Sequence, residues 1–230
     1  MGFEGAPLSQ AYFTPELFAF FDGLAANNDR DWFNANKGRY EAAVRAPFMR
    51  FISDLQPHLD RISPHLVVDP RPTGGSMFRI HRDTRFSKDK TPYKTWAAVF
   101  FPVGRGRTEG ASPGFFFSLG HGRGGAGAGV WRPDPASLGK IREAIADDPD
   151  GWRKATKGLE IGGESLTRAP KGYDADHPLI EDLKRKDFIT RMEITPEMAC
   201  ADDLLDRYVA LCRKTAPLAA FLAGALELDW

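Results

Sequence analysis

The sequence has few of the residues and motifs that usually indicate a particular chemistry. Its 230 residues include only two cysteines, Cys200 and Cys212, whose spacing fits neither a disulfide framework nor a zinc site. The five histidines show no spacing typical of a metal-binding pair. No P-loop motif occurs. We therefore predict no metal site, and the sequence specifies neither a cofactor nor a reaction.

Long apolar runs and an excess of one charge are also absent. The apolar run from Ala97 to Val103 is far shorter than the ~20 residues that a membrane-spanning helix needs. The first residues, MGFEGAPLSQAY, lack the basic and apolar regions of a secretory signal. The 31 basic residues are balanced by 31 acidic ones, which argues against nucleic-acid binding through bulk positive charge. We expect a cytoplasmic protein without a membrane partner.

Three cap-and-proline pairs predict where helices begin. Thr14-Pro15, Asp134-Pro135 and Thr195-Pro196 each place a capping side chain before a proline at the first helical position. Apolar residues at helical spacing follow each pair. The predicted helices run from Thr14 to Asn27, from Asp29 to Pro64 with a kink or restart at Pro47, from Asp134 onward, from Pro149 to Lys157, and from Thr195 onward with an interruption at Pro217.

The middle of the chain is richer in aromatic and β-branched residues, which is typical of strands. The predicted strands are Ser76 to Arg82, Thr95 to Phe101, Phe115 to Leu119, a short one at Val130-Trp131, and Phe188 to Thr195. The short connections between consecutive strands favour antiparallel pairing. We predict an α+β fold with a mainly antiparallel sheet, flanked by N-terminal and C-terminal helices, as one domain over residues 12–230 after a flexible tail of residues 1–11.

The densest charge lies in the segment FRIHRDTRFSKDKTPYKT, residues 78–95. Six cations stand against only Asp83 and Asp89, so the segment carries about four excess positive charges. Guanidinium groups fork onto phosphate or carboxylate, lysines supply point charges, and hydroxyls add further hydrogen bonds. We therefore predict an anion-binding site with these candidate residues: Arg79, Arg82, Arg85, Ser87, Lys88, Lys90, Tyr93 and Lys94.

Two other interpretations of this segment remain open. The cations could instead pair with acidic residues inside the fold, either Asp83 and Asp89 or the helix residues Asp29, Asp31 and Glu41, and so form an internal salt-bridge lattice. Such a protein would act through a contact with another protein. The segment could also serve a nucleic-acid-associated module, together with the arginines of nearby glycine-rich loops, Arg105, Arg107 and Arg123.

Three further patterns in the sequence have a possible structural or functional role. The junction Asn27 to Trp32 is best explained structurally, as one helix ending and Asp29 capping the next. His177 precedes Pro178 in a turn-forming string and is the best candidate for a general base, since Asp174 and Asp176 are close enough to orient its ring. The run Gly122 to Gly127 fits a dinucleotide-binding fingerprint, but no helix is expected to begin within it, so we reject that function.

The basic segment also carries a family resemblance when it is taken with three other strings. These are ANNDRDWFNANKGRYE at residues 26–41, SPGFFFSL at 112–119, and KGYDADHP with LKRKDF at 171–188. Together the four resemble domain-of-unknown-function family 2461, a family of conserved hypothetical proteins found widely in bacteria and also in fungi. The resemblance covers nearly the whole chain in order. It implies a single domain and brings with it no activity, cofactor or catalytic residue.

Overall fold

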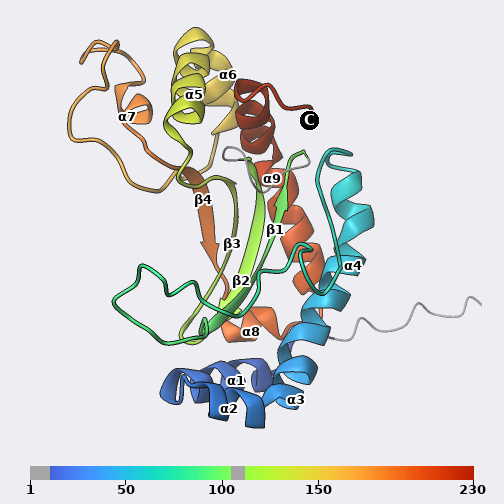
Figure 1. Cartoon of the computed structure of the whole chain (residues 1–230). Coiled ribbons are helices and arrows are strands. Elements are labelled where there is room, and N and C mark those ends of the chain that lie inside the picture. Colours follow the sequence, from blue (N-terminus) through green and yellow to red (C-terminus); the bar gives the residue numbers. More distant parts are fainter. Residues whose placement is uncertain (1–10, 105–111) are drawn as a thin grey trace, which may run out of the picture.

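Helices and a four-stranded antiparallel sheet make up the computed structural model, which describes residues 11–104 and 112–230 (Figure 1). Helices precede the sheet, separate its last two strands and follow it to the C-terminus. The predicted α+β fold with helices at both ends is therefore confirmed. In the described part of the chain, no helix is long and apolar enough to cross a membrane.

The N-terminal helices begin where the cap signals placed them. They are α1 (Pro15–Ala26), α2 (Arg30–Ala35), α3 (Lys37–Tyr40), a π-helical turn (Glu41–Arg45) and α4 (Ala46–Asp60). Thr14 precedes α1 with extended backbone, and Pro15 opens the helix. The predicted restart near Pro47 is also present, because the regular α-helix resumes only at Ala46, after the π-helical turn.

The sheet is a meander in which each strand pairs with the next along the chain. Its strands are β1 (Trp96–Pro102), β2 (Gly114–Gly120), β3 (Arg123–Val130) and β4 (Phe188–Glu193), in the order β1-β2-β3-β4. All three pairs are antiparallel. Trp96 lies opposite Gly120 at one end of the sheet, and Val130 lies opposite Phe188 at the other.

The remaining helices follow β3 and β4. They are α5 (Pro135–Asp147), α6 (Pro149–Ala155), α7 (Ile180–Leu183), α8 (Pro196–Ala199) and α9 (Leu204–Ala225). The Asp134 carboxylate accepts hydrogen bonds from the first N–H groups of α5, and the Thr195 hydroxyl accepts one from Met198 in α8. Both cap predictions are confirmed.

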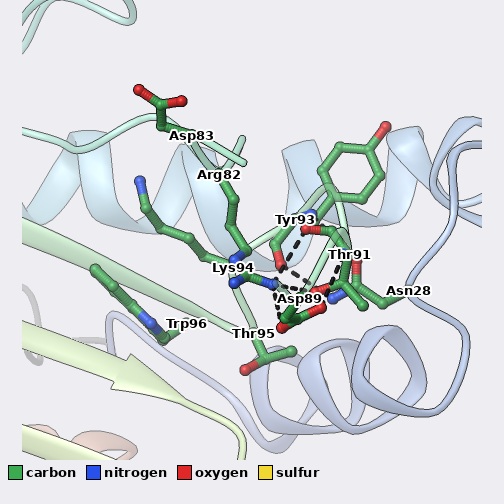
Figure 2. A pocket seen from close by; sticks show the side chains of 9 residues that line it. All are labelled: Asn28, Arg82, Asp83, Asp89, Thr91, Tyr93, Lys94, Thr95 and Trp96. Atoms are coloured by element: carbon green, nitrogen blue, oxygen red, sulfur yellow. Dashed lines mark hydrogen bonds and ion pairs between the residues drawn. The ribbon is translucent and has the colours of Figure 1, made fainter. Parts of the chain in front are cut away.

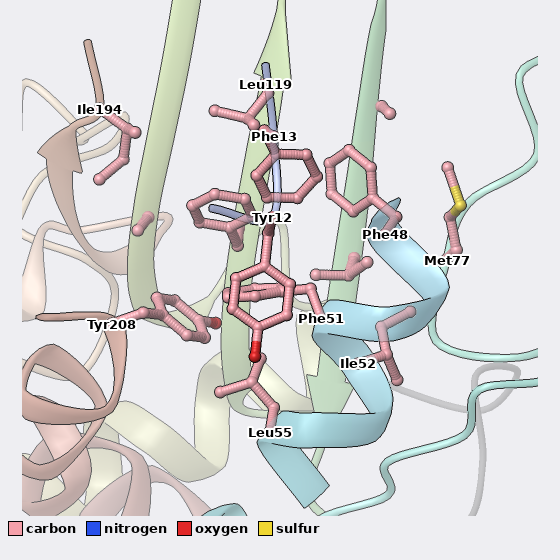
Figure 3. Close-up of a cluster of buried hydrophobic side chains, with 14 of the residues drawn as sticks. Tyr12, Phe13, Phe48, Phe51, Ile52, Leu55, Met77, Leu119, Ile194 and Tyr208 are labelled. Carbon is pink, nitrogen blue, oxygen red and sulfur yellow. The ribbon is translucent and has the colours of Figure 1, made fainter. Parts of the chain in front are cut away.

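One face of the sheet, the core face, carries the larger of two hydrophobic clusters. Val99, Phe101 and Phe117 point from the strands into this cluster and are fully buried. Helix α4 supplies Phe48 and Phe51 to the same cluster (Figure 3). A second cluster joins the end of β3 to α5, α6 and α7. Because α9 contributes residues to both clusters, we propose that residues 12–230 form one domain.

The strand predicted over Ser76 to Arg82 is wrong. This segment makes only isolated bridges, Met77 with Val99 and His81 with Tyr93. Its first half therefore pairs with β1, whereas its second half pairs with the chain around Tyr93, shortly before β1 begins. The change of partner interrupts the ladder and leaves no continuous strand.

The glycine-rich run also differs from expectation, since it forms most of β3 and the predicted strand at Val130-Trp131 is only its last residue. Glycine is depleted in strands, so the pattern suggested a loop. Here glycine permits a close approach. A Cβ atom on Gly127 would lie 1.9 Å from the carbonyl oxygen of Thr190, and one on Gly129 would lie 1.9 Å from that of Phe188.

The predicted interruption at Pro217 is wrong, because α9 continues through it to Ala225. Two residues on either side of the proline, Thr215 and Leu218, are buried at about zero exposure. The Thr215 hydroxyl donates to the Leu211 carbonyl oxygen at 2.9 Å, in the turn before the proline. Packing on both sides thus outweighs the local preference of proline to end a helix.

Candidate functional site

The basic segment forms a hairpin-like loop that directly precedes β1. The Arg82 N–H donates to the Pro92 carbonyl oxygen, and the Lys94 N–H donates to that of Ile80, each at 2.8 Å. We call residues 79–94 the basic hairpin. It projects from the end of the sheet where Trp96 pairs with Gly120, near α1 and α2 and away from α5 to α7 (Figure 1).

Two contacts attach the basic hairpin to the N-terminal helices. The side-chain amide of Asn28 exchanges hydrogen bonds with the backbone of Tyr93, at 3.0 and 3.1 Å. The Tyr93 ring stacks on Phe33 of α2, with the ring centroids 4.2 Å apart. The Asp29 carboxylate caps α2 by accepting from the Trp32 N–H at 2.8 Å, so the structural interpretation of the junction is confirmed. Through Asn28, the junction also anchors the second half of the basic hairpin at Tyr93.

Inside the basic hairpin, two arginines are neutralised by the two local acids. Arg82 pairs with Asp89 and also donates to the Thr91 hydroxyl, while Arg85 pairs with Asp83 at 2.7 Å. The Arg85 guanidinium lowers the pKa of Asp83 to about 2. The Thr91 backbone N–H, and next the Arg82 guanidinium, lower the pKa of Asp89 to about 2. Both carboxylates are therefore charged at neutral pH, and both pairs are intact there.

The other four cations of the basic hairpin form no ion pair with the described residues; they are Arg79, Lys88, Lys90 and Lys94. The Lys94 ammonium donates to the Arg79 carbonyl oxygen at 2.6 Å and lies 5.4 Å from the centroid of the Trp96 ring. Burial, and next the neighbouring Arg79, lowers the pKa of Lys94. Lys94 is thus a partly desolvated cation whose charge is not neutralised.

Two open pockets flank the hairpin, and Arg82 and Tyr93 line both. The first, which we call the Lys94 pocket, has a volume of about 440 Å³ (Figure 2). Its lining residues are Asn28, Arg82, Asp83, Asp89, Thr91, Tyr93, Lys94, Thr95 and Trp96. The second, of about 370 Å³, is lined by Arg30, Asn34, His81, Arg82, Thr84, Pro92 and Tyr93. Three of the eight predicted anion-binding residues, Arg82, Tyr93 and Lys94, therefore line a pocket.

The other predicted residues lie around the hairpin outside the two pocket linings. Arg79, Arg85, Lys88 and Lys90 are exposed, and Lys90 donates to the Thr84 carbonyl oxygen at 2.9 Å. Ser87 is half-buried, and its N–H donates to the same oxygen at 3.3 Å. The sequence reasoning missed Asn28, Thr95 and Trp96 as lining residues. Asn28 belongs to one of the strings that carried the family resemblance, and that signal could have drawn attention to it.

His177 lies in the loop before α7, at the other end of the sheet from the basic hairpin. Its Nδ1 atom accepts a hydrogen bond from the Leu179 N–H at 3.1 Å, which fixes the ring to its own turn. The structure thus does not bring His177 together with the predicted anion-binding residues. Its role as a general base stays a prediction.

A histidine that the sequence did not single out lies closer to the site. His121, in the β2–β3 turn, has Nδ1 at 2.7 Å from Oδ1 of Asp22 in α1. Its backbone N–H donates to the carbonyl oxygen of Thr95, a residue of the Lys94 pocket. Of the arginines of the nucleic-acid interpretation, Arg105 and Arg107 lie outside the described residues, and the backbone of Arg123 begins β3.

The fold and the site define a class of protein: an α+β protein with a four-stranded antiparallel meander and a pocketed basic hairpin at one end of it. The family described as "Conserved hypothetical protein (DUF2461)" matches residues 16–221, and the chain belongs to this family. No curated protein matches the chain.

Proposed function

We propose that this protein binds a small phosphorylated or carboxylated ligand in the Lys94 pocket. The observation that carries the proposal is the state of Lys94, a partly buried ammonium group without an ion-pair partner among the described residues, at the wall of an open pocket. An ammonium group has three donors. One of those of Lys94 is used on the Arg79 carbonyl oxygen, which leaves two for a ligand.

Other groups around the pocket suit an anion. Thr91 and Thr95 supply hydroxyls and Asn28 supplies an amide, while the Arg79 side chain adds a second positive charge that acts on Lys94. The charge of Arg82 is already neutralised by Asp89. Arg82 would therefore contribute to ligand binding mainly through the N–H donors that this pair does not use. Two unpaired cysteines fit a reducing compartment, and we place the protein in the cytoplasm.

The internal ion pairs favour a second candidate function. Since Arg82 and Arg85 are neutralised by Asp89 and Asp83, part of the segment is a salt-bridge scaffold. If that were its whole role, the protein would act through a contact with another protein. Such a hairpin would be stabilised by its own pairs and would gain no stability from added anions.

Thermal unfolding with a panel of phosphorylated metabolites and dicarboxylates tests the two candidates. A ligand at a hundred times its dissociation constant raises the free energy of unfolding by about 2.7 kcal/mol. We expect one class of anion to raise the midpoint in the wild type and in Lys154→Met, an exposed lysine on α6, but not in Lys94→Met. If no anion moves the midpoint, the proposal is wrong and the scaffold role is favoured.

A further inference from the structure

Aromatic side chains gather on the face of the sheet opposite the core face, which we call the outer face. Alternation along β1 and β2 points Val99, Phe101 and Phe117 into the core and their neighbours outward. The outward neighbours include Trp96, Phe100 and Phe116, all only partly buried. Phe78, bonded through its backbone N–H to Ala98 at the edge of β1, is 38% exposed.

Two of these rings lie against glycines of a neighbouring strand. Phe100 and Phe116 are directly opposite each other in the β1–β2 register. A Cβ atom on Gly114 would lie 2.9 Å from the Phe100 ring, and one on Gly127 would lie 2.9 Å from the Phe116 ring. Each ring thus covers a glycine of a neighbouring strand. We call Phe78, Trp96, Phe100 and Phe116 the aromatic row.

Cations border the aromatic row on both sides. The Lys94 ammonium lies 5.4 Å from the Trp96 ring centroid and 6.0 Å from that of Phe78. On the far side, the Arg191 guanidinium of β4 lies over Gly125, where a Cβ atom would come within 2.7 Å of its Nε. Trp96 belongs both to the aromatic row and to the lining of the Lys94 pocket.

From this arrangement we infer that the ligand is a nucleotide unit, with its phosphate at Lys94 and its base stacked on the aromatic row. The inference rests on the proposed anion-binding function and names the class of ligand. A phosphate next to a planar ring matches an ammonium group next to exposed aromatic rings. A four-stranded antiparallel sheet with aromatic side chains on its open face is one way in which proteins hold unpaired bases.

A second copy of the chain is the alternative occupant of this surface. The ammonium group of Lys94, which forms no ion pair with the described residues, favours an anionic ligand beside the aromatic row over a second copy of a chain without net charge. The neutral net charge of the chain also argues against binding of a long strand through bulk positive charge. We therefore expect recognition of a free nucleotide or of the few nucleotides of a short single strand.

The test compares ligands that share the phosphate and differ in the base. Adenosine 5′-monophosphate and ribose 5-phosphate are titrated against the wild type, with a short oligodeoxythymidylate as the third probe. We expect the mononucleotide to bind about tenfold more tightly than ribose 5-phosphate, since stacking of a base on an aromatic ring is worth roughly that factor or more. If the oligonucleotide binds more tightly than the mononucleotide, the ligand is a short single strand. If the two bind with equal affinity, the ligand is a free nucleotide.

Three variants locate the base. Phe78→Leu should remove the advantage of the mononucleotide and leave the affinity for ribose 5-phosphate unchanged. Phe116→Leu should weaken only the oligonucleotide, because its ring is farther from Lys94 along the row. Phe86→Leu is the matched control, since Phe86 is 95% exposed at the tip of the basic hairpin and outside the aromatic row. A loss of base preference in Phe86→Leu would overturn the inference.

The outcomes separate this inference from the proposed function. Equal affinity for the mononucleotide and ribose 5-phosphate overturns the nucleotide assignment and leaves the anion site standing. If no anion binds, the proposed function itself fails. A dimer in solution that Phe116→Arg dissociates would assign the aromatic row to a self-contact and would also overturn the inference.

Discussion

The side chain of Asn28 pairs with the backbone of Tyr93 as a strand residue would. Its Nδ2 donates to the Tyr93 carbonyl oxygen at 3.0 Å, and its Oδ1 accepts from the Tyr93 N–H at 3.1 Å. The turn between α1 and α2 thereby satisfies both backbone groups of a residue 65 positions away. An electrically neutral amide thus fixes the geometry of the cation-rich hairpin next to it.

Asn28→Ala should therefore loosen the basic hairpin without changing its charge. Leaving the two Tyr93 backbone groups without their partner should lower the free energy of unfolding by about 1 to 3 kcal/mol, as measured by urea denaturation. Hydrogen exchange at the Tyr93 amide should become faster. Asn27→Ala is the control, because the Asn27 side chain makes an exposed bond to the Gly23 carbonyl oxygen of its own helix. If both variants exchange and unfold like the wild type, the pairing does not hold the hairpin.

A second prediction concerns the glycines of β3. Gly127→Ala would place a methyl group 1.9 Å from the Thr190 carbonyl oxygen, so β4 would have to move away from β3. Core overpacking typically costs about 1 to 3 kcal/mol, and a collision with backbone should reach the upper part of this range. Gly139→Ala in α5 meets nothing within 4 Å and should stabilise the helix by about 0.5 to 1 kcal/mol. Equal midpoints for both variants would contradict the close strand approach.

These glycines show where prediction from sequence stops. Helix starts depend on neighbouring residues, so Thr14, Asp134 and Thr195 could be identified from the sequence alone. The role of Gly127 depends on Thr190, which is distant in the chain and comes close only in the folded sheet. Pro217 was misjudged for the same reason, since the packing around α9 is set by other elements.

In the candidate site, too, one part could be predicted from the sequence and another part depends on the fold. The density of positive charge at residues 78–95 is visible in the sequence, and three of the residues predicted from it, Arg82, Tyr93 and Lys94, line one pocket. The distinction between neutralised and unneutralised cations was not visible. It depends on Arg82 reaching Asp89 across the hairpin, whereas Lys94 points toward the aromatic rings of Phe78 and Trp96.

A third prediction follows from the lowered pKa of Lys94, which lies below the usual lysine value of 10.5. Since the ammonium form attracts an anion, ligand affinity should fall as the pH rises, and the fall should begin before ordinary lysines lose their protons. Affinity measured from about pH 7 to about pH 10 checks this. Lys94→Arg should move the decline to higher pH, because a guanidinium stays protonated. The same decline in Lys94→Arg would assign the titration to another group.

The same shift predicts a dependence of stability on pH in the absence of ligand. The unfolded chain holds the Lys94 proton more tightly than the folded protein does, so the unfolded state binds more protons between the two pKa values. The contribution of Lys94 to the free energy of unfolding should therefore increase as the pH rises through the folded pKa toward 10.5. Lys94→Met should lack this contribution, whereas Lys154→Met should retain it. Denaturant midpoints at two pH values decide between them.

The last prediction concerns Asp187, a carboxylate only 2% exposed at the start of β4. Its Oδ1 accepts from the Arg132 N–H at 2.7 Å, and its Oδ2 accepts from the Glu164 N–H at 2.9 Å. Arg132 has a positive φ of 49°, a backbone conformation that residues other than glycine rarely adopt. The hydrogen bond from the Arg132 N–H to Asp187 therefore stabilises a strained turn after β3. One buried carboxylate thereby joins three segments that are far apart in sequence.

Asp187→Asn is nearly isosteric but replaces one acceptor with an NH₂ donor. Either Arg132 or Glu164 would then face a donor with its own N–H, and we expect a loss of about 1 to 3 kcal/mol in the free energy of unfolding. Hydrogen exchange should become faster at one of these two amides, and the measurement identifies which. Asp150→Asn, at an exposed residue of α6, is the matched control and should behave like the wild type. If Asp187→Asn unfolds with the control, the Arg132 turn is held by its own packing and not by the carboxylate.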